Sequence, residues 1–240
     1  MRRYIGWLVL GLGGLLSLAT VLGFFGSLYW LLDVLAYWRF QYAALLLGLL
    51  LLGIFVLRPR HHALWLVPAL LLNMVALAPY FMPGDTIARD DDGLRVLAIN
   101  IKADNDRVAP LAAHIHEIDP DVVVVTEMTP EHFAQLRAEL EIDFPHIVDE
   151  SQEGYFGIVL LSRLPIDHHT VHRLGVEDHP SIEATVSWQG RPVTVYGIHL
   201  HPPLSQWGAR QRDTETQEMM EVIAGIEEPQ IVAGDFNATP

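Results

Sequence analysis

Three long apolar runs without a charged residue constrain the fold of this chain more than any other feature. They cover residues 5–25, 41–57 and 63–82. An α-helix needs about 20 apolar residues to cross a bilayer, and the second run is at the short end of the usable range. A cleaved signal peptide for the first run and a buried core helix for any of them are the alternatives. We expect three transmembrane helices in a membrane domain of residues 1–82.

The distribution of arginine predicts the orientation of these helices. Arginines cluster before the first run and between the second and third runs, whereas the intervening loop 27–40 holds one, Arg39. The clustered residues are Arg2, Arg3, Arg58 and Arg60. Cytoplasmic loops are enriched in lysine and arginine, so the N-terminus and the second loop are predicted to be cytoplasmic. Everything after Met82 is then expected outside the cytoplasmic membrane, which in a Gram-negative cell is the periplasm.

The composition changes after the third run. Residues 83–93 are polar and turn-prone, which predicts a linker, and we expect a second domain over 94–240. Of the 15 basic and 29 acidic residues of the chain, nine and 24 lie in 93–240, so this part carries a net charge of −15. Tight nonspecific binding to DNA or RNA uses many lysine and arginine contacts to phosphate, so nucleic acid is disfavoured as the main ligand.

The hydrophobic pattern of the second domain predicts an α/β chain. Alternating or continuous apolar runs predict strands over 94–101, 122–126, 157–161, 182–188, 193–199 and 230–233. Helical spacing predicts helices over 108–118, 130–140 and 213–226. The number of strands is sufficient for two sheets.

Several polar side chains stand at or just after the ends of predicted strands. They are Asn100, Glu127, His199, Asp235 and Asn237. Hydrolysis of a phosphoester requires a hard cation held by carboxylates, donors to the phosphoryl oxygens and an oriented water. Glu127 is the main candidate metal ligand, with Asn100 and Asp235 as further ligands. Asp235 can also activate the water, His199 can donate a proton, and the two asparagines can donate to phosphate.

Each of these residues has an ordinary structural alternative. An isolated strand-end glutamate is usually solvated, and an isolated asparagine or aspartate more often caps a turn. His199 and His201 share a face and could bind zinc, but no thiolate or third clustered histidine completes a tetrahedral set. The order of the candidates along the chain favours a functional site over these alternatives.

This order of motifs resembles the endonuclease/exonuclease/phosphatase superfamily. The motifs are Asn100-Ile101, DPDVVVVTE ending in Glu127, GYFGIVLLSRLPI (154–166), VYGIHLHPP around His199, and GDFNATP (234–240). The resemblance covers about 93–240. It implies a four-layered α/β sandwich with two mixed central sheets, and phosphoester cleavage by in-line attack of water with Mg²⁺, or alternatively Mn²⁺, as cofactor.

The resemblance also implies roles for the site residues. Glu127 corresponds to the metal-binding glutamate of the superfamily, Asn100 to its first active-site asparagine, His199 to its strand-end histidine, and Asp235 and Asn237 to its catalytic Asp and Asn. The superfamily completes its site with a C-terminal Asp-His pair, whereas the sequence ends at Pro240. We therefore expect little or no activity from these 240 residues and activity from the full-length gene product.

The preferred interpretation is a membrane-anchored phosphodiesterase or phosphatase that acts on lipid headgroups or small phosphoesters. A membrane-tethered nuclease is the first alternative, although the net charge of −15 disfavours it. The second alternative is a non-catalytic binding module with a degenerate site.

Overall fold

The structure, a computed structural model, describes residues 2–82, 93–105, 108–225 and 228–238. It separates into two units, each with its own packed interior. The first is helical and the second, within 89–202 and 207–237, is an α/β unit. Of the expected linker 83–93, only Gly93 lies within the described residues.

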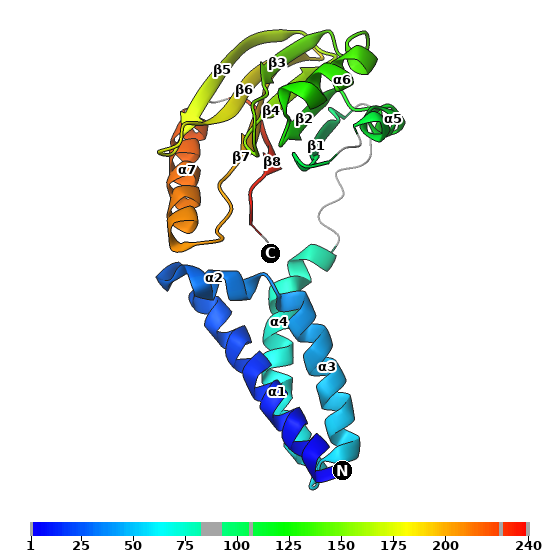
Figure 1. The fold of residues 1–240 in the computed structure, drawn as a ribbon, viewed down its shortest axis with the longest axis vertical. Helices are drawn as coiled ribbons and strands as arrows, with labels where there is room; N and C mark the ends of the chain where they lie inside the picture. Colours follow the sequence, from blue (N-terminus) through cyan, green and yellow to red (C-terminus); the bar gives the residue numbers. More distant parts are fainter. Residues whose placement is uncertain (1, 83–92, 106–107, 226–227, 239–240) are drawn as a thin grey trace. The chain divides into compact units, whose positions relative to one another are not determined.

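The helical unit contains the three expected apolar helices (Figure 1). The stretches Arg3–Leu28, Arg39–Val56 and Arg60–Phe81 are each long and apolar enough to cross a membrane. Its elements are α1 (Arg2–Leu22), η1 (Gly23–Leu28), α2 (Trp30–Ala36), α3 (Arg39–Val56), η2 (Arg60–Leu66) and α4 (Val67–Phe81). The expected loop 27–40 thus contains a short helix, α2.

A polar contact joins two helices inside this unit. The fully buried Asn73 donates from Nδ2 to Thr20 Oγ1 at 2.8 Å and to Ala69 O at 3.0 Å. A side-chain amide among apolar helices needs such partners, because an unsatisfied polar group in an apolar medium costs several kcal/mol. The contact therefore links α4 to α1 and satisfies the Nδ2 donor of Asn73.

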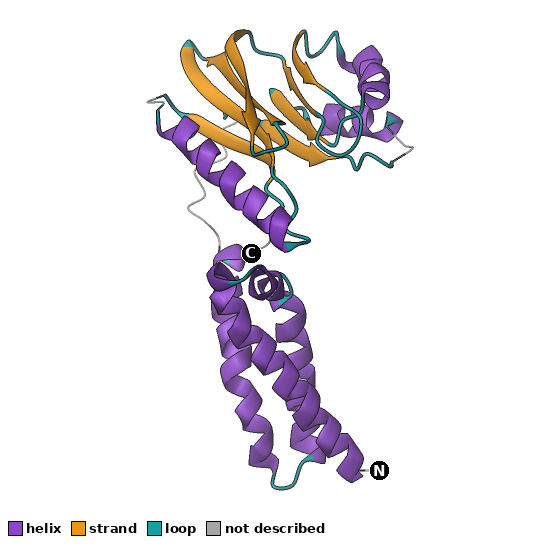
Figure 2. Cartoon of the chain, turned by 60° about the vertical axis from the view of Figure 1, so that its left-hand side comes forward, coloured by secondary structure: helices purple, strands orange, loops and turns teal. Residues whose placement is uncertain are grey.

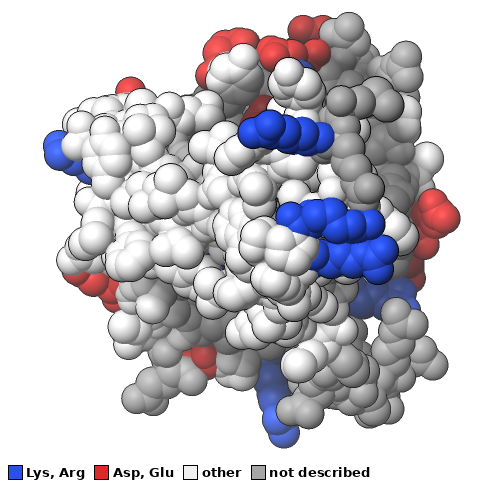
Figure 3. Space-filling view, turned by 90° about the horizontal axis from the view of Figure 1, so that it is seen from below, with Lys and Arg blue, Asp and Glu red and all other residues white. Residues whose placement is uncertain are grey.

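Basic side chains lie at one end of the helical unit. Arg3 is at the start of α1, and Arg58 and Arg60 lie where α3 gives way to η2. Seen from below, this end shows basic side chains, which in this unit are all arginines, among mostly uncharged atoms (Figure 3). This is the distribution from which the orientation is predicted; the compartment of each end stays a prediction.

The α/β unit contains two mixed four-stranded sheets. The first has the order β1-β2-β4-β3, with β1 parallel to β2 and the other pairs antiparallel. Its strands are β1 (Val96–Asn100), β2 (Val122–Thr126), β3 (His146–Glu150) and β4 (Ile158–Ser162). The second has the order β5-β6-β7-β8, and only β7 and β8 are parallel. Its strands are β5 (Ile166–Leu174), β6 (His179–Trp188), β7 (Arg191–His199) and β8 (Gln230–Asp235).

Three apolar layers hold these sheets and their helices in a four-layered sandwich (Figure 2). Helices α5 (Ala109–Ile118) and α6 (Pro130–Leu140) pack on the first sheet, and α7 (Gln206–Ala224) packs on the second. Strand β2 shows why its sequence is a continuous valine run. Val123 and Val125 face the helices, whereas Val122 and Val124 face the second sheet, so both faces of the strand are buried.

The sequence pattern missed two strands and began two elements at least three residues too late. Strands β3 and β5 were not expected; each is one of the two outer strands of its sheet. An edge strand commonly carries polar residues, and the HIVDE and IDHHTVHRL sequences lack a clear apolar face. Strand β6 begins at His179 rather than at 182, and α7 begins at Gln206 rather than at 213. The first turns of α7 are polar and contain Gly208, so they carry little helical signal.

Candidate active site

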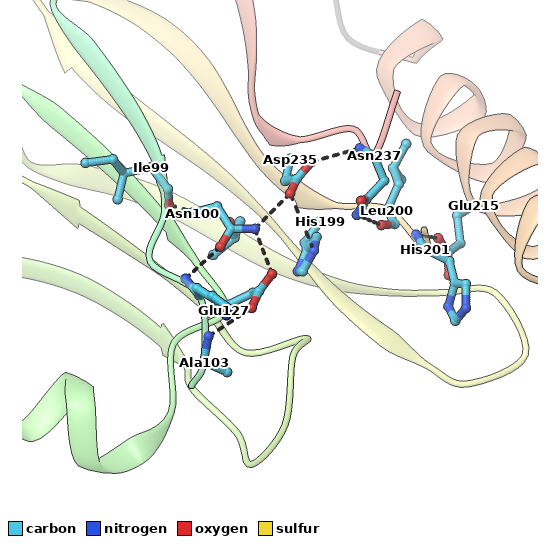
Figure 4. A network of polar contacts seen from close by, with 12 residues as sticks. Ile99, Asn100, Ala103, Glu127, His199, Leu200, His201, Glu215, Asp235 and Asn237 are labelled. Atoms are coloured by element: carbon cyan, nitrogen blue, oxygen red, sulfur yellow. Dashed lines mark hydrogen bonds and ion pairs between the residues drawn. The ribbon is translucent and has the colours of Figure 1, made fainter. Parts of the chain in front are cut away.

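The expected site residues converge where the parallel strands of both sheets end (Figure 4). Asn100 is the last residue of β1 and Glu127 follows β2 directly. His199 and Asp235 end β7 and β8 and are register partners. Because parallel strands deliver their carboxyl ends to the same edge of a sheet, four distant sequence segments meet at one place.

Asn100 connects the two sheets through its side chain. Its Nδ2 donates to Glu127 Oε1 and to Asp235 Oδ2, each at 2.8 Å. Its Oδ1 accepts from the backbone N–H of Lys102 at 2.8 Å, which fixes the orientation of the amide. One amide group therefore holds two carboxylates from different sheets close together, and its oxygen is directed to Lys102 rather than to the carboxylates.

The backbone around Glu127 holds its carboxylate in place. Glu127 adopts φ 60°, a left-handed conformation that is uncommon for a residue with a side chain. Its Oε2 accepts from the N–H of Ala103 at 2.9 Å. The next residue is held by Gly157, since Met128 N donates to Gly157 O at 3.0 Å and a Cβ at Gly157 would lie 1.9 Å from Met128 O. Gly157 thus has a structural role in the 154–166 motif.

The GDFN sequence forms a tight turn that orients Asp235. Asn237 N donates to Asp235 Oδ1 at 2.8 Å, and Asn237 Nδ2 donates to Leu200 O at 2.7 Å. Gly234 adopts φ +140°, and a Cβ there would lie 1.9 Å from Ile198 O. The side-chain amide of Asn237 is therefore bonded to the end of β7, where it supports the site, instead of being directed at the carboxylate pair.

His199 is buried beside the two carboxylates. Its Nε2 lies 3.9 Å from Asp235 Oδ2, and its Nδ1 has no hydrogen-bond partner within the described chain. Burial lowers the pKa of His199 below its usual 6.5, although the carboxylates of Asp235 and Glu127 act in the opposite direction. The ring is therefore neutral at pH 7, and a neutral imidazole can bind a cation or exchange a proton.

This group of side chains suits a divalent cation. Glu127, His199 and Asp235 each offer one ligand atom, and these atoms lie within 4.8 Å of one another. Two carboxylates facing one another repel unless a positive charge lies near them. Within the described residues, these carboxylates accept hydrogen bonds from neutral N–H groups of Asn100, Ala103 and Asn237. A cation held by Glu127 and Asp235 would remove this repulsion. Asn100 is placed to orient these ligands, because its oxygen is bonded to Lys102 N.

His199 and His201 do not form the histidine pair considered for zinc. The backbone N–H of His201 donates to Glu215 Oε2 at 2.7 Å, and its ring nitrogen Nδ1 lies 3.9 Å from Glu177 Oε2. In Figure 4, His201 lies beside Glu215, apart from the group around Glu127. The ring of Phe156 lies near both histidines, with centroid distances of 5.1 Å to His199 and 5.4 Å to His201. The two histidines thus belong to different groups of side chains.

Sequence reasoning missed two contributors to the site. The Ala103 amide was missed because every residue except proline carries an N–H, so no residue type identifies this donor. Phe156 lies in the quoted 154–166 motif, but its position beside His199 depends on how β4 and β7 pack, which no local pattern reveals. A search for aromatic residues near strand ends would have identified Phe156 as a candidate.

Comparisons with known proteins agree with this fold. The model of the Endonuclease/Exonuclease/phosphatase family matches residues 97–240. A sequence search of curated proteins finds no match. TDP2 from D. rerio, complexed with a single strand DNA product, is 18% identical with a TM-score of 0.54, over 61% of this chain and 62% of that chain. TDP2 from C. elegans is 16% identical with a TM-score of 0.53, over 75% of this chain and 58% of that chain.

A bacterial protein has a similar fold. A beta hairpin deletion mutant of beta toxin from Staphylococcus aureus is 18% identical with a TM-score of 0.52, over 62% of this chain and 70% of that chain. The chain spans less than two thirds of either TDP2 chain. Identities this low establish a shared fold and leave the chemistry to the site itself.

Proposed function

The chain belongs to the Endonuclease/Exonuclease/phosphatase family, and on this premise we propose that its α/β unit hydrolyses phosphoesters with Mg²⁺ or Mn²⁺ at the outer face of the cytoplasmic membrane. The observation that carries the proposal is the convergence of Glu127, His199 and Asp235, whose ligand atoms lie within 4.8 Å. These side chains lie at or directly after the ends of three separate strands, so their meeting is a property of the fold.

The side chains have distinct tasks in this proposal. Glu127 and Asp235 would hold a divalent cation, which when bound would neutralise charge on the phosphoryl group and lower the pKa of a coordinated water. Asn100 keeps both carboxylates in place through its two 2.8 Å hydrogen bonds. The neutral ring of His199 donates a hydrogen bond from its N–H to a phosphoryl oxygen. Asn237 fixes Asp235 through its backbone N–H.

The charge of the α/β unit favours lipid headgroups or small phosphoesters as substrates. Nine basic residues lie in 93–240, against 24 acidic ones, and Arg107 is outside the described residues. Five of the other eight form ion pairs with carboxylates, so their charges are already compensated. They are Arg95, Arg137, Arg163, Arg173 and Arg212. A nucleic-acid backbone would need several such charges for itself. A membrane anchor, if the apolar helices serve as one, would keep the site near phospholipids.

A nuclease is the second candidate function. The similarity of the fold to a TDP2 structure complexed with a single strand DNA product favours it. Single strands are bound largely by aromatic stacking in addition to charge. The half-exposed Tyr155 and the ring of Phe156 precede β4, and Phe156 is 5.1 Å from His199, so a stacking surface lies close to the site. A non-catalytic binding module is the third candidate.

The test measures hydrolysis by the complete gene product, purified in detergent. The substrates are a phospholipid phosphodiester in mixed micelles, a soluble phosphate ester, single-stranded DNA and double-stranded DNA. We expect hydrolysis of the lipid or of the soluble ester, its loss on chelation, and its recovery with Mg²⁺ or Mn²⁺. Cleavage confined to DNA would establish the second candidate instead. Failure to cleave any substrate while the cation binds would establish the binding module.

Variants of the site test whether its individual side chains contribute to the reaction. Glu127→Gln and His199→Ala are each expected to lower kcat by about 10²-fold or more, because each removes a group that acts on the phosphoryl group or its cation. Glu139→Gln is the matched control, since Glu139 is an exposed glutamate on α6. Equal activity of Glu127→Gln and Glu139→Gln would exclude a role of this carboxylate in the reaction.

A further inference from the structure

A second group of metal-ligating side chains lies in the α/β unit, outside the site described above. Glu177 is in the turn between β5 and β6, His179 begins β6, and His201 follows β7. Each offers one ligand atom, and the three atoms lie within 4.8 Å of one another. The proposed hydrolysis uses none of these residues. We propose that they bind a divalent cation of the zinc class, and this inference is independent of the proposed activity.

The distances from Glu177 to the two histidines approach those of a tetrahedral site. Glu177 Oε2 lies 3.3 Å from His179 Nε2 and 3.9 Å from His201 Nδ1. Ligands at about 2.0–2.1 Å from a tetrahedral zinc ion lie roughly 3.3 Å from one another. Small side-chain movements would therefore complete the coordination. Two of the three ligands are imidazoles, which favour zinc, nickel or copper over Mg²⁺.

A buried carboxylate behind His179 supports this assignment. Glu215 of α7 is 1% exposed, and its Oε1 lies 2.9 Å from His179 Nδ1. When Nδ1–H donates to this carboxylate, the lone pair of Nε2 faces Glu177. Two acceptors, Nε2 and Glu177 Oε2, then lie 3.3 Å apart, an arrangement that a cation between them relieves. A carboxylate that accepts from the far nitrogen of a metal-binding histidine is a common feature of metal sites.

His201 presents an unsatisfied nitrogen to the same place. Its Nδ1 is buried and has no hydrogen-bond partner among the described residues. Its position is fixed by its own backbone N–H, which donates to Glu215 Oε2 at 2.7 Å, and by Gly208, where a Cβ would lie 3.1 Å from the ring carbon Cδ2. A buried lone pair without a partner is costly, and a cation would satisfy it.

The second group is close to the first but has its own ligands. Phe156 stacks on His179 at a centroid distance of 3.5 Å and is tilted against His199 at 5.1 Å. One aromatic ring thus contacts a ligand from each group. The half-exposed Glu177 leaves its side of the group accessible to solvent, so a water can occupy the fourth position of a zinc site.

The test is a measurement of zinc stoichiometry in the full chain with the Glu127→Gln substitution, which removes a ligand of the first group. The protein is purified in detergent, stripped with a chelator, and dialysed against Zn²⁺ in excess Mg²⁺. We expect one retained zinc per chain. Glu177→Gln and His201→Ala should each weaken zinc binding at least 100-fold, and Glu215→Gln should weaken it about 10–100-fold.

Two controls keep the result interpretable. His169→Ala removes an exposed histidine of β5 and should leave zinc binding unchanged. Glu177→Gln alters a half-exposed side chain, so it reports on the site even if His201→Ala fails to fold. Absence of a retained zinc would overturn the proposal, as would unchanged affinity in Glu177→Gln. In that case the His179 ring only bridges the carboxylates of Glu177 and Glu215.

Discussion

At Gly234, both the backbone conformation and the neighbouring strand exclude a side chain. Its φ of +140° is accessible to few residues other than glycine, and a Cβ there would lie 1.9 Å from Ile198 O of the neighbouring strand. Gly234→Ala combines backbone strain with a backbone clash, and we expect it to destabilise the protein by about 3 kcal/mol. Thermal or denaturant unfolding followed by circular dichroism measures the effect.

The clash and the backbone strain can be separated with a second glycine. Gly190 also has a positive φ, +75°, but a Cβ there meets no atom within 4 Å. Gly190→Ala should therefore cost only the strain, about 1 kcal/mol. Equal losses in the two variants would mean that the contact with Ile198 does not restrict Gly234.

The protonation of His199 follows from two opposing influences. Burial lowers its pKa, whereas the carboxylates of Asp235 and Glu127 raise it. The ring of His179 also lowers the pKa of His199, and the carboxylate of Glu215 raises it. Removal of an anion that favours the imidazolium should lower the pKa further, so Asp235→Asn is expected to titrate at lower pH than the unsubstituted protein.

NMR titration of ¹³C-labelled histidine in the chelator-treated protein measures this shift. The midpoint of His199 should lie below 6.5 and should fall in Asp235→Asn. A folded-state pKa below the unfolded value means that the unfolded chain binds more protons, so this histidine lowers stability as the pH falls from about 6.5 through the folded pKa. A midpoint that rises in Asp235→Asn would contradict the assigned role of the carboxylate.

At the scale of elements, the layer between the two sheets determines whether the site forms. Asn100 and Glu127 come from one sheet and His199 and Asp235 from the other. The two sheets must therefore pack on one another in one fixed position for the four side chains to meet. Leu160 of β4 is fully buried in this layer. Leu160→Ala should destabilise the protein by about 2–5 kcal/mol, because it leaves a cavity that the neighbouring β-branched side chains cannot fill.

Denaturant unfolding measures this loss, with Ile142→Ala as the control. Ile142 is an apolar residue that is 90% exposed, so its truncation should change stability by less than about 0.5 kcal/mol. Similar effects of the two substitutions would mean that the layer between the sheets contributes little to stability.

The elements that the sequence predicted are those whose apolar residues form a clear run or a regular period. Strand β2 was predicted with both of its ends, because four consecutive valines fill two cores. Strand β5 was missed because it lies at a sheet edge and its three histidines are compatible with a loop. The site residues were found at strand ends. The bridging role of the Asn100 amide was not predicted, because a hydrogen bond between residues 100 and 235 depends on how the two sheets stack.

At the scale of the whole molecule, the chain joins an apolar helical unit to an acidic α/β unit. The first supplies three helices long enough to span a bilayer, and the second carries a net charge of −15 over 93–240. Negative charge hinders adsorption to anionic lipid. Membrane-spanning helices in the same chain would hold the α/β unit at the membrane despite this repulsion.

The orientation of that anchor is the prediction on which the proposed location of the reaction depends. Arg3, Arg58 and Arg60 lie at one end of the helical unit, whereas the loop 27–40 holds one arginine. Positively charged loops are retained in the cytoplasm, so a reporter fused after Arg60 should be cytoplasmic and one fused after Gly93 should be outside. Fusions to alkaline phosphatase, active only outside, and to a fluorescent protein, active only inside, measure both ends.

Moving the three arginines into the loop 27–40 should invert both readings, because the charge difference is then reversed. A cytoplasmic reading after Gly93 in the unsubstituted chain would place the α/β unit in the cytoplasm, and its substrate would have to be sought there.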